Sequence, residues 1–294
     1  MLFQCSNPDF HVRSVQNNEI FAVRRQALST SKVFRESDLP ECTLVYSMIN
    51  PGDMFTCCGE SEQTLDLHES ADNLSALLNL LHRPPPPPTQ IKRDEYHLIP
   101  KVWNDPKTVI PLPLLPRLFT LADKYALPES VVGVLGKHLL AHAPEEPLMV
   151  YILALSQDLH HVASQTSQYL QPMANYDLDE VKAIPVEAYH RVVQLQDTRV
   201  KAMRKYLLSE DIFPHGYGSC ATHSRETTHL WNSKRMSLAV KVETLTDVAG
   251  EMEIAAYQEP IQSCAVCRKA CVAAVEMLRY KCRKIPKTVD KLNL

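Results

Sequence analysis

Two short pairs of metal-ligating residue types lie in the C-terminal third of the chain. Cys220 and His223 are separated by two residues, and so are Cys264 and Cys267. This spacing lets a short turn place both ligands on one side of a metal ion, and thiolate and imidazole groups are typical ligands of structural zinc. Turn-forming residues at 214–218 precede the first pair. The spacing therefore predicts a closed tetrahedral zinc site that uses all four side chains.

The same cysteines have a second interpretation, because reduced cysteines also pack as small hydrophobic side chains. Forty residues separate the two pairs, a long interval for such a site, and they are expected to hold a helix through Trp231. Cys271 follows Cys267 by one helical turn and would be a substitute ligand. Metal ligands and buried thiols are both compatible with the sequence.

Other chemistries lack the patterns that they require. The chain has only seven glycines, and it contains no GxGxxG, GxxxxGK[ST], HExxH or GxSxG pattern, which excludes the common dinucleotide, P-loop, zinc-protease and serine-hydrolase sites. No family signature surrounds any cysteine, so a thiol enzyme is a weak option. His138 and His142 have ligand spacing on one expected helix, but without a third ligand they indicate surface histidines. We therefore expect no enzymatic activity.

Alternation of apolar and polar residues predicts strands near the N-terminus. The runs 10–15 and 19–23 flank an asparagine-containing turn and predict a β-hairpin. A short helix over 25–34 and a third strand over 64–68 are expected next. The following helix is expected to be capped by Asp72 and to end at five consecutive prolines, which cannot continue a helix.

From Leu112 onward the pattern is helical. Proline is tolerated in the first helical turn, and four prolines mark expected helix starts: Pro113, Pro128, Pro147 and Pro185. The longest expected helix covers 186–208. Residues 89–111 are polar and contain prolines, so they predict a long exposed loop.

Three motifs occur in the order seen in one known family. Residues 21–35 are similar to its strand-to-helix motif, although Arg24 stands where that family usually has histidine. Residues 64–69 are similar to the strand that follows, and Leu-Phe-Thr-Leu-Ala-Asp-Lys-Tyr at 118–125 is similar to a late helix. On these residues, the first 145 positions resemble the BTB/POZ domain, in the layout of the many such proteins of mushroom-forming fungi.

The resemblance implies a small sheet with helices and a role in protein–protein interaction. In that family this means dimerisation and, in some members, bridging of a substrate to a cullin ubiquitin-ligase scaffold. Some cullin-binding members carry a hydrophobic-x-Glu tripeptide, and no confident match is present, so cullin binding stays an open option. Residues 36–52 and 89–111 depart from the family pattern. We interpret them as insertions, or as intervening sequence kept in a gene model.

Charge is distributed unevenly although the net charge is only −3. Residues 144–267 hold ten basic and sixteen acidic side chains, whereas residues 268–294 hold eight basic and two acidic ones. A global basic field for nucleic acid is therefore excluded. The basic end suits an acidic partner, or it follows from the preference of Lys and Arg for the C-terminal end of a helix.

The sequence gives no indication of a membrane or a secretory route. Residues 1–10 have neither a basic start nor an apolar core, so we expect no signal peptide. The apolar runs are far shorter than a membrane span. A soluble cytoplasmic or nuclear protein with reduced cysteines is expected.

These patterns predict an α+β chain with a BTB/POZ-like domain over 1–145 and an all-helical region over 146–294. A zinc ion that links the two ligand pairs of this region is one of the two interpretations of its cysteines. The expected function is non-enzymatic protein–protein interaction, as an adaptor or a self-associating protein, with no nucleic acid or membrane partner. The alternative is a zinc-stabilised regulator whose basic C-terminal end binds nucleic acid or an acidic protein.

Overall fold

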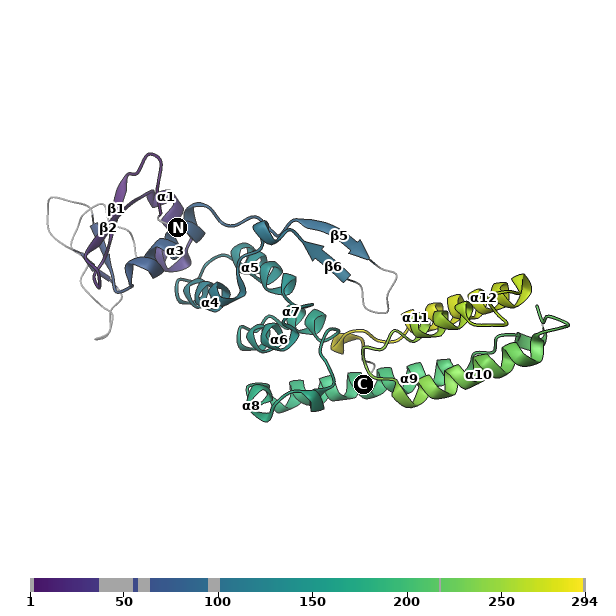
Figure 1. Ribbon diagram of the computed structural model, residues 1–294. Helices are drawn as coiled ribbons and strands as arrows, with labels where there is room; N and C mark the ends of the chain where they lie inside the picture. The colour runs from purple at the N-terminus through teal and green to yellow at the C-terminus, as the bar shows by residue number, and fades with distance from the viewer. Residues whose placement is uncertain (1–2, 37–54, 58–63, 95–100, 217, 293–294) are drawn as a thin grey trace. The chain divides into compact units, whose positions relative to one another are not determined.

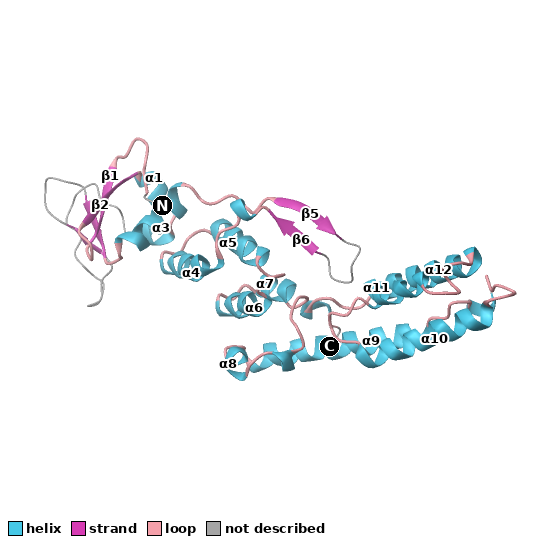
Figure 2. Ribbon diagram, in the orientation of Figure 1, coloured by secondary structure: helices cyan, strands magenta, loops and turns pink. Residues whose placement is uncertain are grey.

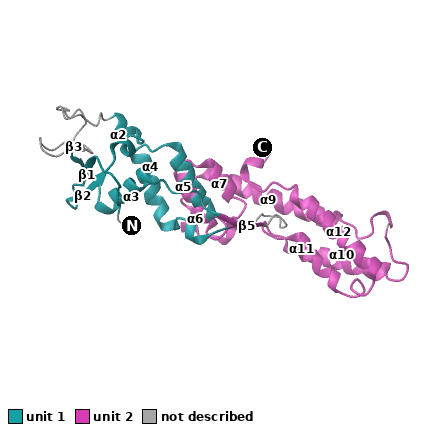
Figure 3. Cartoon of the chain, turned by 90° about the horizontal axis from the view of Figure 1, so that it is seen from above, with its two compact units in different colours: residues 1–89, 104–141 teal, residues 90–103, 142–294 magenta. Residues whose placement is uncertain are grey.

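The computed structural model describes residues 3–36, 55–57, 64–94, 101–216 and 218–292 (Figure 1). The chain forms two compact units (Figure 3). Unit 1 comprises Met1–Thr89 and Asn104–Ala141, and unit 2 comprises Gln90–Trp103 and His142–Leu294. The expected α+β class with an all-helical C-terminal region is confirmed (Figure 2). The division into domains at residue 145 stays a prediction.

A small mixed sheet forms one part of unit 1. β1 (Phe10–Ser14) pairs antiparallel with β2 (Glu19–Val23) and parallel with β4 (Thr64–Leu67), while β3 (Phe55–Cys57) pairs antiparallel with β4. The strand order is β2-β1-β4-β3. Asn18 adopts a φ of 53° in the turn between β1 and β2, a conformation that asparagine tolerates. The predicted hairpin and the predicted strand near residue 64 are confirmed.

Helices complete unit 1, and they correct two predictions of the sequence analysis. The segment 25–34, expected as one helix, forms two, because the buried Ser31 lies between them: its Oγ accepts from the backbone N–H of Phe34 and donates to the carbonyl of Tyr125. The helix after β4 is capped by Ser70 and not by Asp72, since the Ser70 Oγ accepts a hydrogen bond from the backbone N–H of Asn73. The helical segments are α1 (Arg25–Leu28), α2 (Lys32–Glu36), α3 (Ala71–His82), η1 (Pro106–Thr108), η2 (Leu112–Leu114), α4 (Leu115–Lys124) and α5 (Glu129–Ala141).

The prediction of a long loop over residues 89–111 is wrong, because part of this segment forms two strands. β5 (Gln90–Asp94) and β6 (Lys101–Asn104) pair with each other, and the 3-10 turn η1 follows. Pairing of β5 with β6 provides backbone N–H and C=O groups of this polar segment with hydrogen-bond partners inside the protein. Apart from Glu36, the other proposed insertion, 36–52, lies outside the described residues.

The C-terminal helices of unit 2, α9 (Val186–Ser209), α10 (Ser224–Lys241), α11 (Val248–Glu253) and α12 (Ala265–Arg283), share one apolar core. α9 packs against both α10 and α12, and α11 packs against α12. The fully buried Trp231 of α10 donates its Nε1–H to the carbonyl of Glu210 at 2.9 Å. The helical segments of unit 2 are α6 (Pro147–Ser156), α7 (His160–Thr166), η3 (Met173–Asn175), α8 (Leu178–Val181), α9 (Val186–Ser209), η4 (Pro214–Gly216), α10 (Ser224–Lys241), α11 (Val248–Glu253), η5 (Ile254–Tyr257), α12 (Ala265–Arg283) and η6 (Val289–Lys291).

The basic helix α12 is paired with acidic residues of its own unit. The guanidinium of Arg279 lies 2.9 Å from the Glu253 carboxylate, and the Lys281 ammonium lies 2.5 Å from the buried Glu210 carboxylate. Part of the charge asymmetry along the sequence is therefore neutralised inside unit 2. In the part of the chain that the structure describes, no helix has both the length and the apolar character to cross a bilayer.

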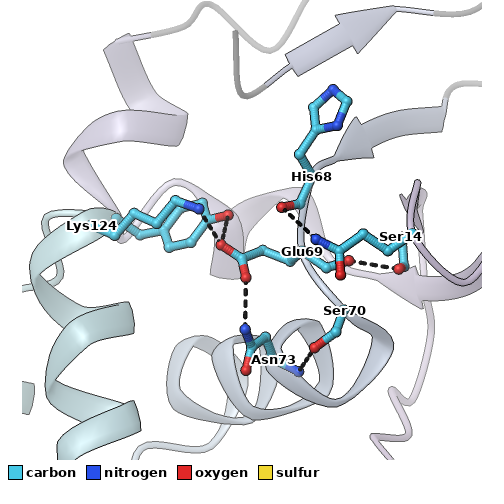
Figure 4. A network of polar contacts seen from close by, with 8 residues as sticks. Ser14, His68, Glu69, Ser70, Asn73 and Lys124 are labelled. Carbon is cyan, nitrogen blue, oxygen red and sulfur yellow. Dashed lines mark hydrogen bonds and ion pairs between the residues drawn. The ribbon is translucent and has the colours of Figure 1, made fainter. Parts of the chain in front are cut away.

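Unit 1 contains a polar network around one buried carboxylate (Figure 4). Glu69, between β4 and α3, accepts hydrogen bonds from Lys124 Nζ, from Tyr125 Oη at 3.2 Å and from Asn73 Nδ2 at 2.9 Å. Its own carbonyl accepts from Ser14 Oγ at 2.6 Å. One residue thus links the sheet, the start of α3 and the end of α4.

The network decides the charge of Glu69. Burial by itself raises the pKa of this carboxyl, but the hydrogen bonds from Lys124 and Asn73 and the charge of Lys124 outweigh burial and hold the pKa below 4.5. A depressed carboxyl pKa contributes stability above the unfolded-state pKa, and that contribution is lost as the pH falls through the folded-state value.

We predict that Glu69→Gln lowers the free energy of unfolding of unit 1 by about 1–2 kcal/mol at neutral pH, because a charge-assisted network becomes neutral. The difference from the unchanged protein should shrink as the pH falls below about 4.5. Hydrogen exchange of β1, β4 and α3, measured by mass spectrometry across this range, gives both values. A pH-independent difference would show that the substitution acts through packing alone.

Candidate metal centre

The four predicted ligands occupy the starts of two helices in unit 2. His223 is the N-cap residue of α10, and Cys220 lies three residues before it. Cys264 is the N-cap residue of α12, and Cys267 lies in the first turn of that helix. Each two-residue spacing thus spans a helix entry, where the chain turns sharply enough to place both side chains on one side.

The loop ahead of Cys220 depends on left-handed backbone conformations. Gly216 and Gly218 adopt φ values of 78° and 71°, and His215 adopts 54°. Glycine reaches this region without the steric cost that a Cβ imposes. Apart from the chain neighbours of each glycine, no heavy atom lies within 4 Å of the place that a Cβ would take, so the backbone angle and not a lack of space favours glycine here. The turn residues singled out in the sequence therefore return the chain toward α10.

The ligand atoms of all four residues lie within 4.8 Å of one another. The Sγ atoms of Cys220 and Cys264 are 3.7 Å apart, and the Cys220 Sγ lies 3.6 Å from Nδ1 of His223. Zn–S bonds of about 2.3 Å and Zn–N bonds of about 2.0–2.1 Å in a tetrahedron place two sulfurs about 3.8 Å apart and sulfur and nitrogen about 3.6 Å apart. The group has the dimensions of a four-coordinate site and could hold a metal ion.

Backbone donors at the start of α12 favour a thiolate in this group. The backbone N–H of Cys267 and then the His223 ring lower the pKa of Cys264 to about 6. Backbone N–H groups of His223 and Thr222 likewise lower the pKa of Cys220. Burial acts in the opposite direction on Cys267 and raises its pKa to about 11. Metal ions bind the thiolate form, so two of the three thiols are prepared for coordination and the third depends on the ion to lose its proton.

Cys271, the expected substitute ligand, is not part of the group. It lies one turn further along α12, is completely buried, and packs in the hydrophobic core of unit 2. Burial raises the pKa of its thiol to about 11. The interpretation of cysteines as small hydrophobic side chains therefore fits Cys271 and Cys282, whereas the two spaced pairs come together as potential ligands.

The histidine pair predicted at the surface has a different placement. His138 is buried, its Nε2 lies 2.9 Å from the carbonyl of Pro86, and its Nδ1 accepts from the backbone N–H of Ile110 at 3.2 Å. Helix α5 ends at Ala141, so His142 follows the helix and does not extend its face. The predicted surface position of His138 is therefore wrong, because its ring is buried among backbone partners.

Sequence reasoning missed a buried arginine in unit 2. Arg199 of α9 is 1% exposed, and its Nη1 donates to the carbonyl of Gln168 at 3.3 Å, just past the end of α7. Burial lowers the pKa of Arg199 to about 10. The sequence held one signal of this burial. Arg199 lies seven residues after Val192 and four before Met203, so it shares the buried face of α9 with them. The Gln168 carbonyl lies 31 residues away along the chain, so no local pattern reveals this contact.

Comparison with known proteins adds no homologue: no family model, no curated protein and no solved structure matches the chain. The resemblance to the BTB/POZ domain stays a prediction. The chemistry of the described residues is therefore the basis for any functional assignment, and the group at Cys220, His223, Cys264 and Cys267 is its most specific feature.

Proposed function

We propose that this chain is a non-enzymatic protein-interaction protein whose C-terminal unit is held together by a structural zinc ion. The observation that carries the proposal is the closed group of Cys220, His223, Cys264 and Cys267. Three sulfurs and one imidazole form a ligand set that zinc prefers. Four protein ligands leave no position for water or substrate, which is the arrangement of a structural and not a catalytic site.

The zinc ion would supply a cross-link that the polar loops of unit 2 cannot supply themselves. Cys220 follows a short turn, and Cys264 follows the irregular segment after η5. Joining them fixes the start of α10 to the start of α12. Because the unfolded chain has no preformed site, the free energy of metal binding becomes folding free energy of this region.

The interaction role is proposed for unit 1. Its support is the BTB/POZ-like motifs together with the order of elements: a hairpin, two short helices, a further strand and a series of helices. β2 lies at an edge of the sheet, and Ile20 on it is 54% exposed. An exposed edge strand with an apolar side chain can pair with another chain. A second copy of the protein is the simplest partner.

We predict about one zinc ion per chain in protein purified without a histidine tag, and loss of this zinc in Cys264→Ser. The Cys5→Ser variant, which changes a thiol of unit 1 outside the group, is the matched control and should retain zinc. Elemental analysis of folded protein measures both. Clearly less than one zinc per chain in the folded, unmodified protein would remove the metal from the proposal.

Chelation should loosen unit 2 and spare unit 1. A Trp103→Phe background leaves the buried Trp231 as the only tryptophan. Its emission should move to longer wavelength when zinc is removed and return when zinc is added, because water reaches α10. Hydrogen exchange of β1 and β4 should stay unchanged. An emission spectrum that does not respond to chelator contradicts a structural role.

Self-association is predicted for the full chain, at a mass above the 33.3 kDa of one copy. Ile20→Lys should weaken association, since a charge at a strand edge opposes edge pairing. Val186→Lys, at an equally apolar and 79% exposed position of unit 2, is the control. Sedimentation velocity measures the species with and without chelator. A chain that stays monomeric and binds no partner contradicts the interaction role.

A further inference from the structure

The three thiols of the metal group differ in their access to solvent. Cys220 and Cys264 are partly exposed, whereas Cys267 is completely buried. The two accessible sulfurs are also in contact, with their Sγ atoms 3.7 Å apart. A reagent that arrives from solvent therefore meets two adjacent sulfurs first, one from each of the segments that the group joins.

The backbone at these two cysteines is free of regular helix. Cys264 is an N-cap residue with φ −102° and ψ 112°, and Cys220 lies between η4 and α10. Cys267 is held in the first turn of α12 with its side chain in the core. A disulfide requires the sulfurs to approach to about 2.05 Å. The accessible pair can make this movement by adjusting two loops, whereas the sulfur of Cys267 is shielded from solvent and its backbone is fixed in the first turn of α12.

We infer that Cys220 and Cys264 form a site of oxidative modification, at which hydrogen peroxide converts the metal-bound thiolates into a disulfide. The inference rests on the zinc site proposed above. One thiolate attacks the peroxide, the O–O bond breaks, and a sulfenic acid forms while hydroxide leaves and is protonated to water. The second thiolate attacks the sulfenic sulfur, the S–S bond forms, the S–O bond breaks, and a second water leaves after protonation.

The electron balance of this reaction leaves the metal unchanged. The two sulfurs together lose two electrons, and hydrogen peroxide with two protons becomes two waters. The zinc ion stays Zn²⁺ and loses two of its four ligands, so it is released, since His223 and Cys267 alone do not complete a tetrahedral site. The disulfide joins the same two segments that the ion joined. Oxidation therefore exchanges one cross-link between the starts of α10 and α12 for another.

The test treats the full, zinc-loaded chain with hydrogen peroxide in the Trp103→Phe background. We expect loss of one zinc ion per chain, detected by a colorimetric chelator, and a Cys220–Cys264 linkage in a non-reduced digest analysed by mass spectrometry. Trp231 emission should stay at the wavelength of the loaded protein, unlike that of the chelated, reduced protein. Thiol reductant followed by zinc should restore the starting state.

Two variants make the result specific. Cys5→Ser should leave zinc loss and the linkage unchanged. Cys220→Ser removes the second thiol, so Cys264 should accumulate as a sulfenic acid that dimedone labels. Retention of zinc, release of zinc without the linkage, or a linkage that contains Cys267 overturns the inference. Absence of zinc from the purified protein would contradict the proposed metal site but not the oxidation of Cys220 and Cys264. Linkage mapping after peroxide treatment of the metal-free, reduced protein tests that oxidation separately.

Discussion

Two helices of unit 2 begin at the same place, and this convergence is the constraint on which the C-terminal half depends. The N-terminal end of a helix carries a partial positive charge and unpaired N–H groups. Bringing the starts of α10 and α12 together is therefore unfavourable unless negative charge lies between them. Cys220 and Cys264 supply it, because backbone N–H donors lower the pKa values of both thiols. Three thiolates, one neutral imidazole and Zn²⁺ would carry a net charge of −1, which suits two positive helix ends.

Unit 1 meets a related constraint with a carboxylate. Glu69 immediately precedes Ser70, the N-cap residue of α3, and it accepts from Lys124 in the last turn of α4. The anion therefore lies at a positive helix end and the cation at a negative one, which is the arrangement that helix dipoles favour. Both units place an anionic group in a short connection and surround it with donors from distant parts of the chain. In each case the group contacts at least one element that lies more than 40 residues away along the chain.

The sequence was informative where the controlling signal is local. The hairpin follows from alternation and an asparagine turn, and the two ligand pairs are recognisable because each spacing fits within one turn. Four ligands within 4.8 Å of one another agree with the predicted grouping. Non-local contacts were beyond reach: Ser31 divides a helix through Tyr125, which is 94 residues away, and Glu69 binds Lys124 across 55 residues. No periodicity encodes such pairs, because each residue is ordinary in its own segment.

Charge shows most clearly how position along a chain differs from position in space. The basic end and the acidic stretch before it look like two surfaces for separate partners, yet Lys281 and Arg279 pair with Glu210 and Glu253 of that stretch. These contacts hold the second half of α12, while the thiol group lies at its start. The helix is thus fixed at both ends by different interactions, one ionic and one built on sulfur. Removing the sulfur-based link loosens the start of α12 and its contacts with α10, while the ion pairs and the buried Leu278 continue to hold the second half of α12.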